Sequence, residues 1–138
     1  MAANITPIFT GAPDIQWNTG GLATANTAKD GTGTVATAFV ADATNGGYIQ
    51  KVRLRPLGTN VATVARIFIN NGSTNTTAAN NILYDEITCS ATTLSEVAAI
   101  ATFEVPMNIA LPPGYKVLVT IGTTVAAGFA VSAVGGKY

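Results

Sequence analysis

The sequence of 138 residues contains no histidine, one cysteine and few charged residues. Without histidine, the chain cannot build a Ser-His-Asp triad, a histidine general base or the usual zinc site. The single cysteine, Cys89, cannot form an internal disulfide, and one thiol excludes zinc ribbons and iron–sulfur clusters. Its position in a strand-like alternation predicts a small buried side chain. The sequence therefore predicts no enzymatic activity, no metal site and no cofactor.

Charged residues make up only 10% of the chain, and seven acids balance seven bases. A typical soluble domain has about 25% charged residues. Nucleic-acid binding requires a cationic surplus, which this chain lacks, so we expect no nucleic-acid partner. A net charge of zero gives little repulsion between copies. The composition is therefore typical of a protein that packs against copies of itself.

Long apolar runs are also missing, since no stretch approaches the ~20 residues of a membrane helix. The first residues, MAANITPIFTG, have neither a basic segment nor an apolar core, so we expect no secretory signal, no membrane partner and synthesis in a cytoplasm. The carboxylates are scattered along the chain. Asp85 and Glu86 are adjacent and must point to opposite faces of a strand, so they cannot form a catalytic pair. The turn at 30–33, DGTG, is a weak calcium candidate, and a polar turn is the favoured interpretation.

The stretch 48–72, YIQKVRLRPLGTNVATVARIFINNG, organises the rest of the chain. It carries four of the seven cationic residues, namely Lys51, Arg53, Arg55 and Arg66. Val52 and Leu54 alternate with the first three cations, which is typical of a strand with one buried face and one wet face. We interpret this stripe as a solvated or salt-bridged strand face. The functional alternative is an electrostatic contact with an acidic protein surface.

Two arrangements of this stretch are open. A hairpin with a four-residue loop or a bulge would gather one apolar face, and we prefer this register; the face would comprise Val52, Leu54, Ala65, Ile67 and Ile69. It would leave Arg53 close to Arg66, and Asp85 or Glu86 is a candidate to neutralise that pair. Alternatively, the chain turns a corner here and its two strands belong to different sheets.

Residues 1–33 are broken by proline and glycine and predict an irregular N-terminal arm, which is part of the same domain or contacts neighbouring molecules. The strand-like island Ile15-Gln16-Trp17 is their one regular feature. Aromatic residues are favoured at contacts because of their large area. Trp17 should therefore anchor the arm either onto its own domain or onto a neighbouring chain, and the sequence does not discriminate between these.

Residues 34–138 predict a β-sandwich domain. Strand patterns recur with turn signals between them, at 34–41, 48–57, 61–70, 82–89, 103–111, 115–122 and 129–134. The segment 71–81 is a polar loop, and 90–101 is either a short helix or a loop. No helical pattern alternates with the strands, which excludes a parallel α/β protein. The prediction is an all-β fold, a single-domain antiparallel β-sandwich of about eight strands with jelly-roll topology preferred.

Four phrases of the sequence carry a resemblance: VRLRPLGTNVATVARIFINNG at 52–72, TAANNILYDEITCSATT at 77–93, EVPMNIALPPGYKVLVTIGT at 104–123 and AVSAVGGKY at 130–138. Together they resemble small all-β virion structural proteins of tailed bacteriophages, which decorate capsids or serve as accessory proteins. The resemblance implies a location in the virion after synthesis in the host cytoplasm. It carries no site motif.

Two functions follow as expectations. The first is a non-enzymatic capsid decoration or cementing protein that binds the assembled shell as a small homo-oligomer, with a trimer favoured. Its partners would be the major capsid protein or other virion proteins, and its interface candidates are Trp17, Lys51, Arg53, Arg55 and Arg66. The second is a tail-fibre or receptor-binding module with a β-sandwich that binds glycans.

Overall fold

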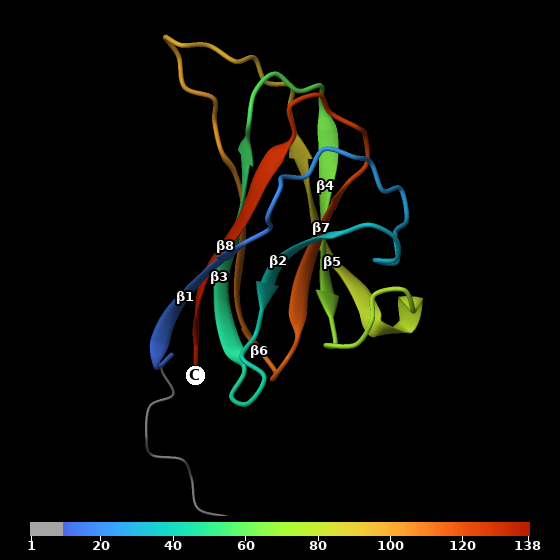
Figure 1. The fold of residues 1–138 in the computed structure, drawn as a ribbon, viewed down its shortest axis with the longest axis vertical. Coiled ribbons are helices and arrows are strands. Elements are labelled where there is room, and N and C mark those ends of the chain that lie inside the picture. The colour runs from blue at the N-terminus through green and yellow to red at the C-terminus, as the bar shows by residue number, and fades with distance from the viewer. Residues whose placement is uncertain (1–9) are drawn as a thin grey trace, which may run out of the picture.

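The computed structural model describes residues 10–138, so residues 1–9 of the predicted arm lie outside the described residues. The fold is an all-β sandwich, as predicted (Figure 1). Its elements are β1 (Ala12–Trp17), β2 (Ala36–Val40), β3 (Gly47–Pro56), β4 (Thr63–Asn70), the 3₁₀ turn η1 (Ala78–Asn80), β5 (Asn81–Cys89), β6 (Phe103–Leu111), β7 (Lys116–Ile121) and β8 (Phe129–Lys137). Within residues 10–138, no helix is long and apolar enough to cross a membrane.

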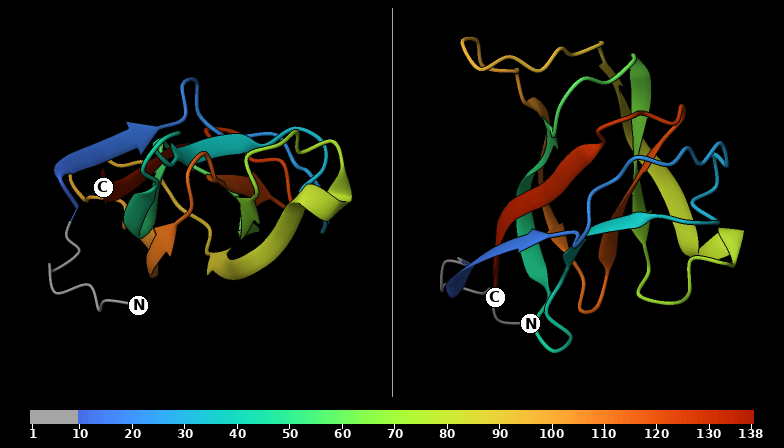
Figure 2. Two further views of the ribbon diagram at one scale, coloured as in Figure 1. Left: turned by 90° about the horizontal axis from the view of Figure 1, so that it is seen from below. Right: turned by 45° about the horizontal axis from the view of Figure 1, so that its top comes forward.

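The strands form two antiparallel four-stranded sheets. Sheet A has the order β1-β8-β3-β6, and sheet B has the order β2-β7-β4-β5. The pairing is nested, because β1 pairs with β8, β2 with β7, β3 with β6 and β4 with β5. Successive strands therefore alternate between the two sheets, except β4 and β5, which are neighbours in sheet B. Strands far apart in the sequence, such as β1 and β8, lie side by side. Figure 2 shows the two layers edge-on.

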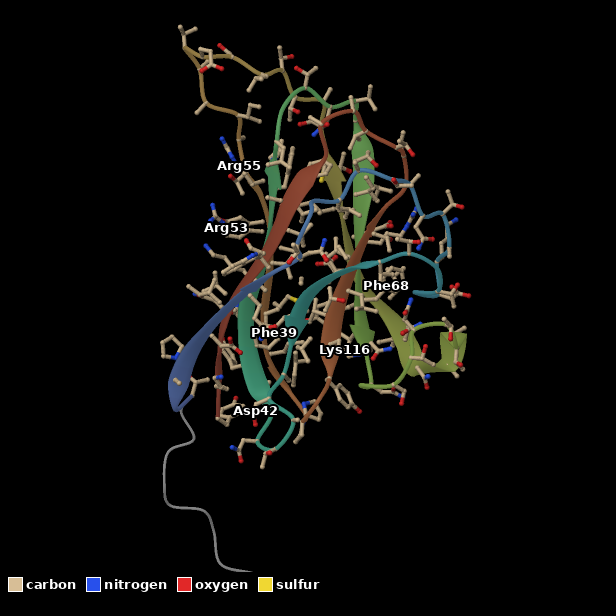
Figure 3. The ribbon with its side chains drawn as sticks, in the orientation of Figure 1. Phe39, Asp42, Arg53, Arg55, Phe68 and Lys116 are labelled. Carbon is tan, nitrogen blue, oxygen red and sulfur yellow. The ribbon has the colours of Figure 1, made fainter. Side chains whose placement is uncertain are left out.

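The core lies between the two sheets and is formed by alternate apolar side chains of both. Val52 and Leu54 point into it from sheet A, and Ala65 and Ile67 point into it from sheet B, all without exposed area. Phe39 of β2 lies between the layers near the lower end of the body (Figure 3). The predicted period-2 pattern is thus satisfied by two facing layers, as expected for a sandwich.

The preferred hairpin between β3 and β4 is wrong, and the alternative corner is what forms. The two strands lie in different sheets and are not paired with each other. The connection between β3 and β4 is fixed by Asn60, which is 3% exposed. Its side-chain amide forms hydrogen bonds with the backbone of Ala127 and Gly128 in the loop before β8. The backbone of Asn60 also bridges to Thr92. The chain is therefore drawn across the end of the sandwich before β4 begins.

The edge and centre positions of the later strands agree with the sequence. β6 is an edge strand and contains Pro106, which has no N–H to donate, and β7 is central in sheet B. The segment 90–102 forms a loop without a helix. Cys89 is buried, and burial raises the pKa of its thiol to about 11.

The strand-like island of the arm forms β1, which is paired with β8 along the edge of sheet A. The chain after β1 is tied to the sandwich by backbone hydrogen bonds. Leu22 exchanges two with Phe129, and the N–H of Asn26 donates to the carbonyl of Ile121. Leu22 is 7% exposed and belongs to the core. Leu22, rather than Trp17, thus fastens this segment to the core.

Candidate functional site

The outer face of sheet A brings together four of the five residues singled out from the sequence. Ile49 and Val52 both point inward although they are three residues apart, because the register of β3 shifts between Ile49 and Lys51. A bulge of this kind re-aims the side chains that follow it. Lys51, Arg53 and Arg55 then line the outer face at alternate positions, and Arg53 and Arg55 extend away from the body in Figure 3.

Lys51 and Arg53 share one carboxylate on the neighbouring strand. The Nζ of Lys51 lies 3.2 Å from Glu104 Oε2, and the Nε of Arg53 lies 3.0 Å from Glu104 Oε1. Lys51 lowers the pKa of the Glu104 carboxyl through a hydrogen bond and through its positive charge, and Arg53 lowers it in the same two ways. All three side chains remain partly exposed, so this network is screened by solvent. The prediction of a salt-bridged strand face is confirmed for Lys51 and Arg53.

Arg55 has no acidic partner among the described residues. Its guanidinium donates to the backbone carbonyl of Ile100 and to the hydroxyl of Thr102, at the end of the 90–102 loop. The stripe therefore carries three cations against the single carboxylate of Glu104, a local charge of +2. This excess is retained on a chain whose net charge is zero.

An exposed apolar ridge lies on the other side of the same face. Trp17 and Ile15 project from β1 and are 69% and 60% exposed. The register aligns Trp17 with Ser132 of β8, and Ser132 with Arg53 of β3. Neighbouring strands lie about 4.8 Å apart, so about 10 Å separates the ridge from the cations.

The strand between the ridge and the cations is β8, whose outward side chains are small. They are Ala130, Ser132 and Val134, followed by Gly136. The face is therefore broad and nearly flat, with an apolar side and a cationic side. It is a surface suited to contact with another macromolecule rather than a cleft for a small substrate.

Arg66, the fifth candidate, lies on the opposite face of the molecule. It points outward from β4 in sheet B, and its Nε is 3.4 Å from Glu86 Oε2 on β5. The predicted neutralisation by Glu86 is confirmed for Arg66, but the predicted closeness of Arg53 and Arg66 is wrong. The reason is the corner between β3 and β4, which places the two guanidinium groups on opposite sheets, each with its own carboxylate.

Over its central strands β4 and β7, the outer face of sheet B is covered, unlike that of sheet A. Phe68 and Leu118 point outward from β4 and β7, yet they are 0% and 2% exposed. The 71–81 loop lies against the segment 30–33 and is fixed by amide side chains: Asn75 donates to the carbonyls of Gly31 and Gly33, and Asn81 donates to that of Asp30. The asparagines of this loop therefore hold two loops together over the sheet.

The edge strand β1, which carries Trp17, makes contacts that the sequence did not predict. The amide of Gln16 reaches across to Val40 of β2, and Ile15 joins Trp17 on the outer face. The alternation of Pro13, Ile15 and Trp17 could have identified Ile15. The interpretation of Trp17 as an anchor onto its own domain is wrong, because its side chain is largely exposed.

Within residues 10–138, no group of three cysteine, aspartate or glutamate residues could hold a metal ion. The carboxylate of Asp30 accepts hydrogen bonds from the N–H and hydroxyl of Thr32, which lower its pKa, so the 30–33 segment forms a polar turn. A hollow of about 290 Å³ beside residues 18–24 and 34–36 is lined by apolar, hydroxyl and amide side chains.

A second hollow, of about 210 Å³, contains one charged residue, Lys116, among amide, hydroxyl and apolar side chains such as Asn70, Thr74 and Leu118. Neither hollow pairs a nucleophile with a base. The outer face of sheet A is therefore the best candidate for a functional surface. Comparison with protein-family models, with curated proteins and with solved structures finds no match to this chain.

Proposed function

We propose that this protein is a non-enzymatic structural component of a phage virion, a capsid decoration or cementing protein that acts as a small homo-oligomer. The observation that carries the proposal is the contrast between the two sheets. The outer face of sheet B is covered over β4 and β7 by the protein's own loops, whereas that of sheet A exposes Trp17 and Ile15 beside a cationic stripe. A bare, flat face of this kind is suited to protein contact.

The fold and composition support the same proposal. The nested pairing of eight strands supports the jelly-roll topology, in which a folded-over ribbon of strands is rolled into two sheets. A charged content of 10% and a net charge of zero suit a protein that is surrounded by other subunits. The resemblance of residues 52–72 and 104–123 to virion proteins of tailed phages points to the particle as its location.

The proposed partners are the major capsid protein or other virion proteins, together with further copies of the chain. An acidic protein surface complements the local charge of +2 on the outer face of sheet A. A decoration protein that binds only the assembled lattice stabilises it by mass action. We propose neither a nucleic-acid partner nor a membrane partner, and a trimer is the favoured oligomer.

A glycan-binding module of a tail fibre is the second candidate. The observation that favours it is the exposure of Trp17, because an exposed indole ring can stack on a sugar. Tyr84 is the other exposed aromatic side chain among the described residues, and it lies on β5 of the opposite sheet. A sugar platform with several aromatic rings on one face is therefore not formed. A glycan-array screen of the purified protein tests this candidate directly.

The proposed function is tested by the stoichiometry of purified particles of a phage that encodes this chain. Quantitative mass spectrometry should find hundreds of copies per particle, since a shell component follows the capsid lattice. A few copies per particle would place the protein in the tail, and none would refute the virion location. Particles lacking the protein should release their contents at a lower temperature than complete particles, because the mass-action stabilisation is lost.

A further inference from the structure

A second exposed surface complements the outer face of sheet A. Five consecutive residues of β5 are exposed, 82–86, with the sequence ILYDE. Ile82, Leu83 and Tyr84 are 64%, 40% and 42% exposed, and they precede the carboxylates of Asp85 and Glu86. We call residues 82–86 the β5 strip. The strip presents apolar side chains and two carboxylates along one exposed edge, and Asp85 and Glu86 lie on opposite faces of that strand.

The apolar ridge on β1 and the β5 strip lie at diagonally opposite corners of the sandwich. β1 is the edge of sheet A that lies next to β2, whereas β5 is the far edge of sheet B, and β1 and β5 lie well apart in both views of Figure 2. Two different surfaces on one chain that fit each other form a heterologous contact, in which one copy passes its strip to the face of the next. Such contacts close into a ring when the rotation between copies permits.

The face of sheet A and the β5 strip carry charges of opposite sign. The face of sheet A has a local charge of +2 from three cations and Glu104. The β5 strip carries two carboxylates, of which Glu86 pairs with Arg66 and Asp85 has no cationic partner among the described residues. Contact between a cationic surface and an acidic one guides association and fixes the register.

The strip does not favour pairing with an identical strip through its backbone. The register of β5 against β4 shifts between Asp85 and Leu83, which leaves Tyr84 as a bulge. Bulges and edge charges both disfavour the addition of a strand. The contact is therefore made by side chains, and its fitting partner is the cationic face.

The face of sheet A is large enough for this contact. Four strands at about 4.8 Å spacing span about 19 Å, and nine residues of β8 at about 3.4 Å each extend about 30 Å. The flat area is then about 570 Å², of the same order as the roughly 800 Å² of accessible surface that each partner of a stable interface buries. Its exposed aromatic residue, Trp17, is of the type that contributes most to binding energy.

We infer that the outer face of sheet A binds the β5 strip of a second copy of this chain, and that this heterologous contact builds the homo-oligomer. The inference deepens the proposed function, because it names the partner of the face on which that proposal rests. It concerns the purified protein alone, so it can fail while the protein still occurs in virions, and it can hold if the protein is found elsewhere.

The mass of the purified protein in solution is the first test. Sedimentation velocity should give a closed oligomer, with about three times the chain mass of 14.0 kDa as the favoured value. Arg53→Glu and Asp85→Arg should each shift the protein to monomer, and the two changes combined should restore the oligomer by reversing the charges at one contact. Lys29→Glu is the matched control, since Lys29 is exposed outside both surfaces and its reversal should leave the mass unchanged.

Cysteine cross-linking tests which surfaces touch. Ser132 lies at the centre of the face and Leu83 lies in the strip, so Ser132→Cys and Leu83→Cys each place a thiol on one of the two surfaces. The native Cys89 is buried. The double variant should form a ladder of disulfide-linked multimers under mild oxidation, whereas each single variant should stay unlinked. A dimer from either single variant would show a contact between identical surfaces and overturn the inference. A wild-type monomer, or single reversals that leave the mass unchanged, would overturn it as well.

Discussion

The side-chain amide of Gln16 in β1 hydrogen-bonds both backbone groups of Val40 in β2. Its Nε2 donates to the Val40 carbonyl at 2.9 Å, and its Oε1 accepts from the Val40 N–H at 2.9 Å. The same Nε2 donates to Asp14 at 2.8 Å. The amide thus takes the place of a neighbouring strand where the edges of the two sheets meet, and it holds β1 in the position that presents Trp17 outward.

Gln16→Ala should lower the free energy of unfolding by about 1–2 kcal/mol. Each hydrogen bond contributes roughly 1 kcal/mol net, and water can replace part of the loss because Val40 is 38% exposed. The midpoint of urea denaturation measures the effect. Gln50→Ala is the matched control, since Gln50 is exposed and makes no side-chain hydrogen bond within residues 10–138. Equal midpoints for the two variants would show that the amide bridge does not stabilise the fold.

Asn60→Ala should be more damaging, with a loss of about 3 kcal/mol. Asn60 is 3% exposed, its Oδ1 accepts the N–H groups of Ala127 and Gly128 at 2.9 and 3.0 Å, and its Nδ2 donates to the Gly128 carbonyl. Truncation leaves buried backbone groups without partners, and each costs about 1–3 kcal/mol. Thermal melting measures the loss. Asn45→Ala, at an exposed turn position, should change stability by less than about 0.5 kcal/mol.

The strands could be predicted because their apolar residues recur with period two. The alternation from Phe103 to Leu111 gives β6 with the observed bounds. The same regularity could not decide between a hairpin and a corner after β3. Val52, Leu54, Ala65 and Ile67 are buried together in either arrangement, as one layer or as two facing layers. The deciding contact, from Asn60 to the loop before β8, joins residues 68 positions apart and has no local signal.

Only part of the candidate surface could be predicted, because the pattern within a strand does not show which strands are neighbours. Lys51, Arg53 and Arg55 share a face because they alternate within one strand, which is local information. Trp17 joins them only through the pairing of β1 with β8 and of β8 with β3. Arg66 was grouped with them because it is near in sequence, and the corner separates it. Contacts within a strand follow from the pattern, whereas contacts between strands follow from the topology.

Acid should weaken the fold through three carboxylates whose pKa values are lowered in the folded state. Lys51 and Arg53 lower the pKa of Glu104, the hydroxyl and N–H of Thr32 lower that of Asp30, and the N–H groups of Asn45 and Thr44 lower that of Asp42. A lowered folded pKa gives stability that is present above the unfolded value and lost as pH falls through the folded value. The loss should therefore begin below the ordinary values of 4.5 for Glu104 and 3.8 for the two aspartates.

Glu104→Gln isolates the contribution of the cationic stripe to this pH dependence. Urea midpoints from about pH 6 down to about pH 3 should fall less steeply for the variant than for the wild type, because one of the three titrating groups is gone. Gln keeps the shape of the side chain but not its charge. If the two proteins lost stability in parallel, the ion pairs of Glu104 with Lys51 and Arg53 would have no part in folding.

Gly135 is the position where a single methyl group should separate two strands of sheet A. It pairs with Ile49 at the register shift of β3, and a Cβ placed on it would collide with the carbonyl oxygen of Tyr48. The collision is with backbone, which cannot rotate away, so Gly135→Ala should cost more than about 3 kcal/mol. Differential scanning calorimetry should show a melting temperature far below that of the wild type.

Gly20→Ala is the matched control for this substitution. Gly20 has a φ of 97° and no atom within 4 Å of an added Cβ, so alanine there meets only the cost of the left-handed conformation, about 1–2 kcal/mol. Gly135→Ala meets the steric cost instead, and it should also weaken the oligomer, because β8 carries the centre of the sheet A face. A Gly135→Ala protein that melts at or above the Gly20→Ala protein would mean that β8 and β3 do not approach as closely as the register at Ile49 requires.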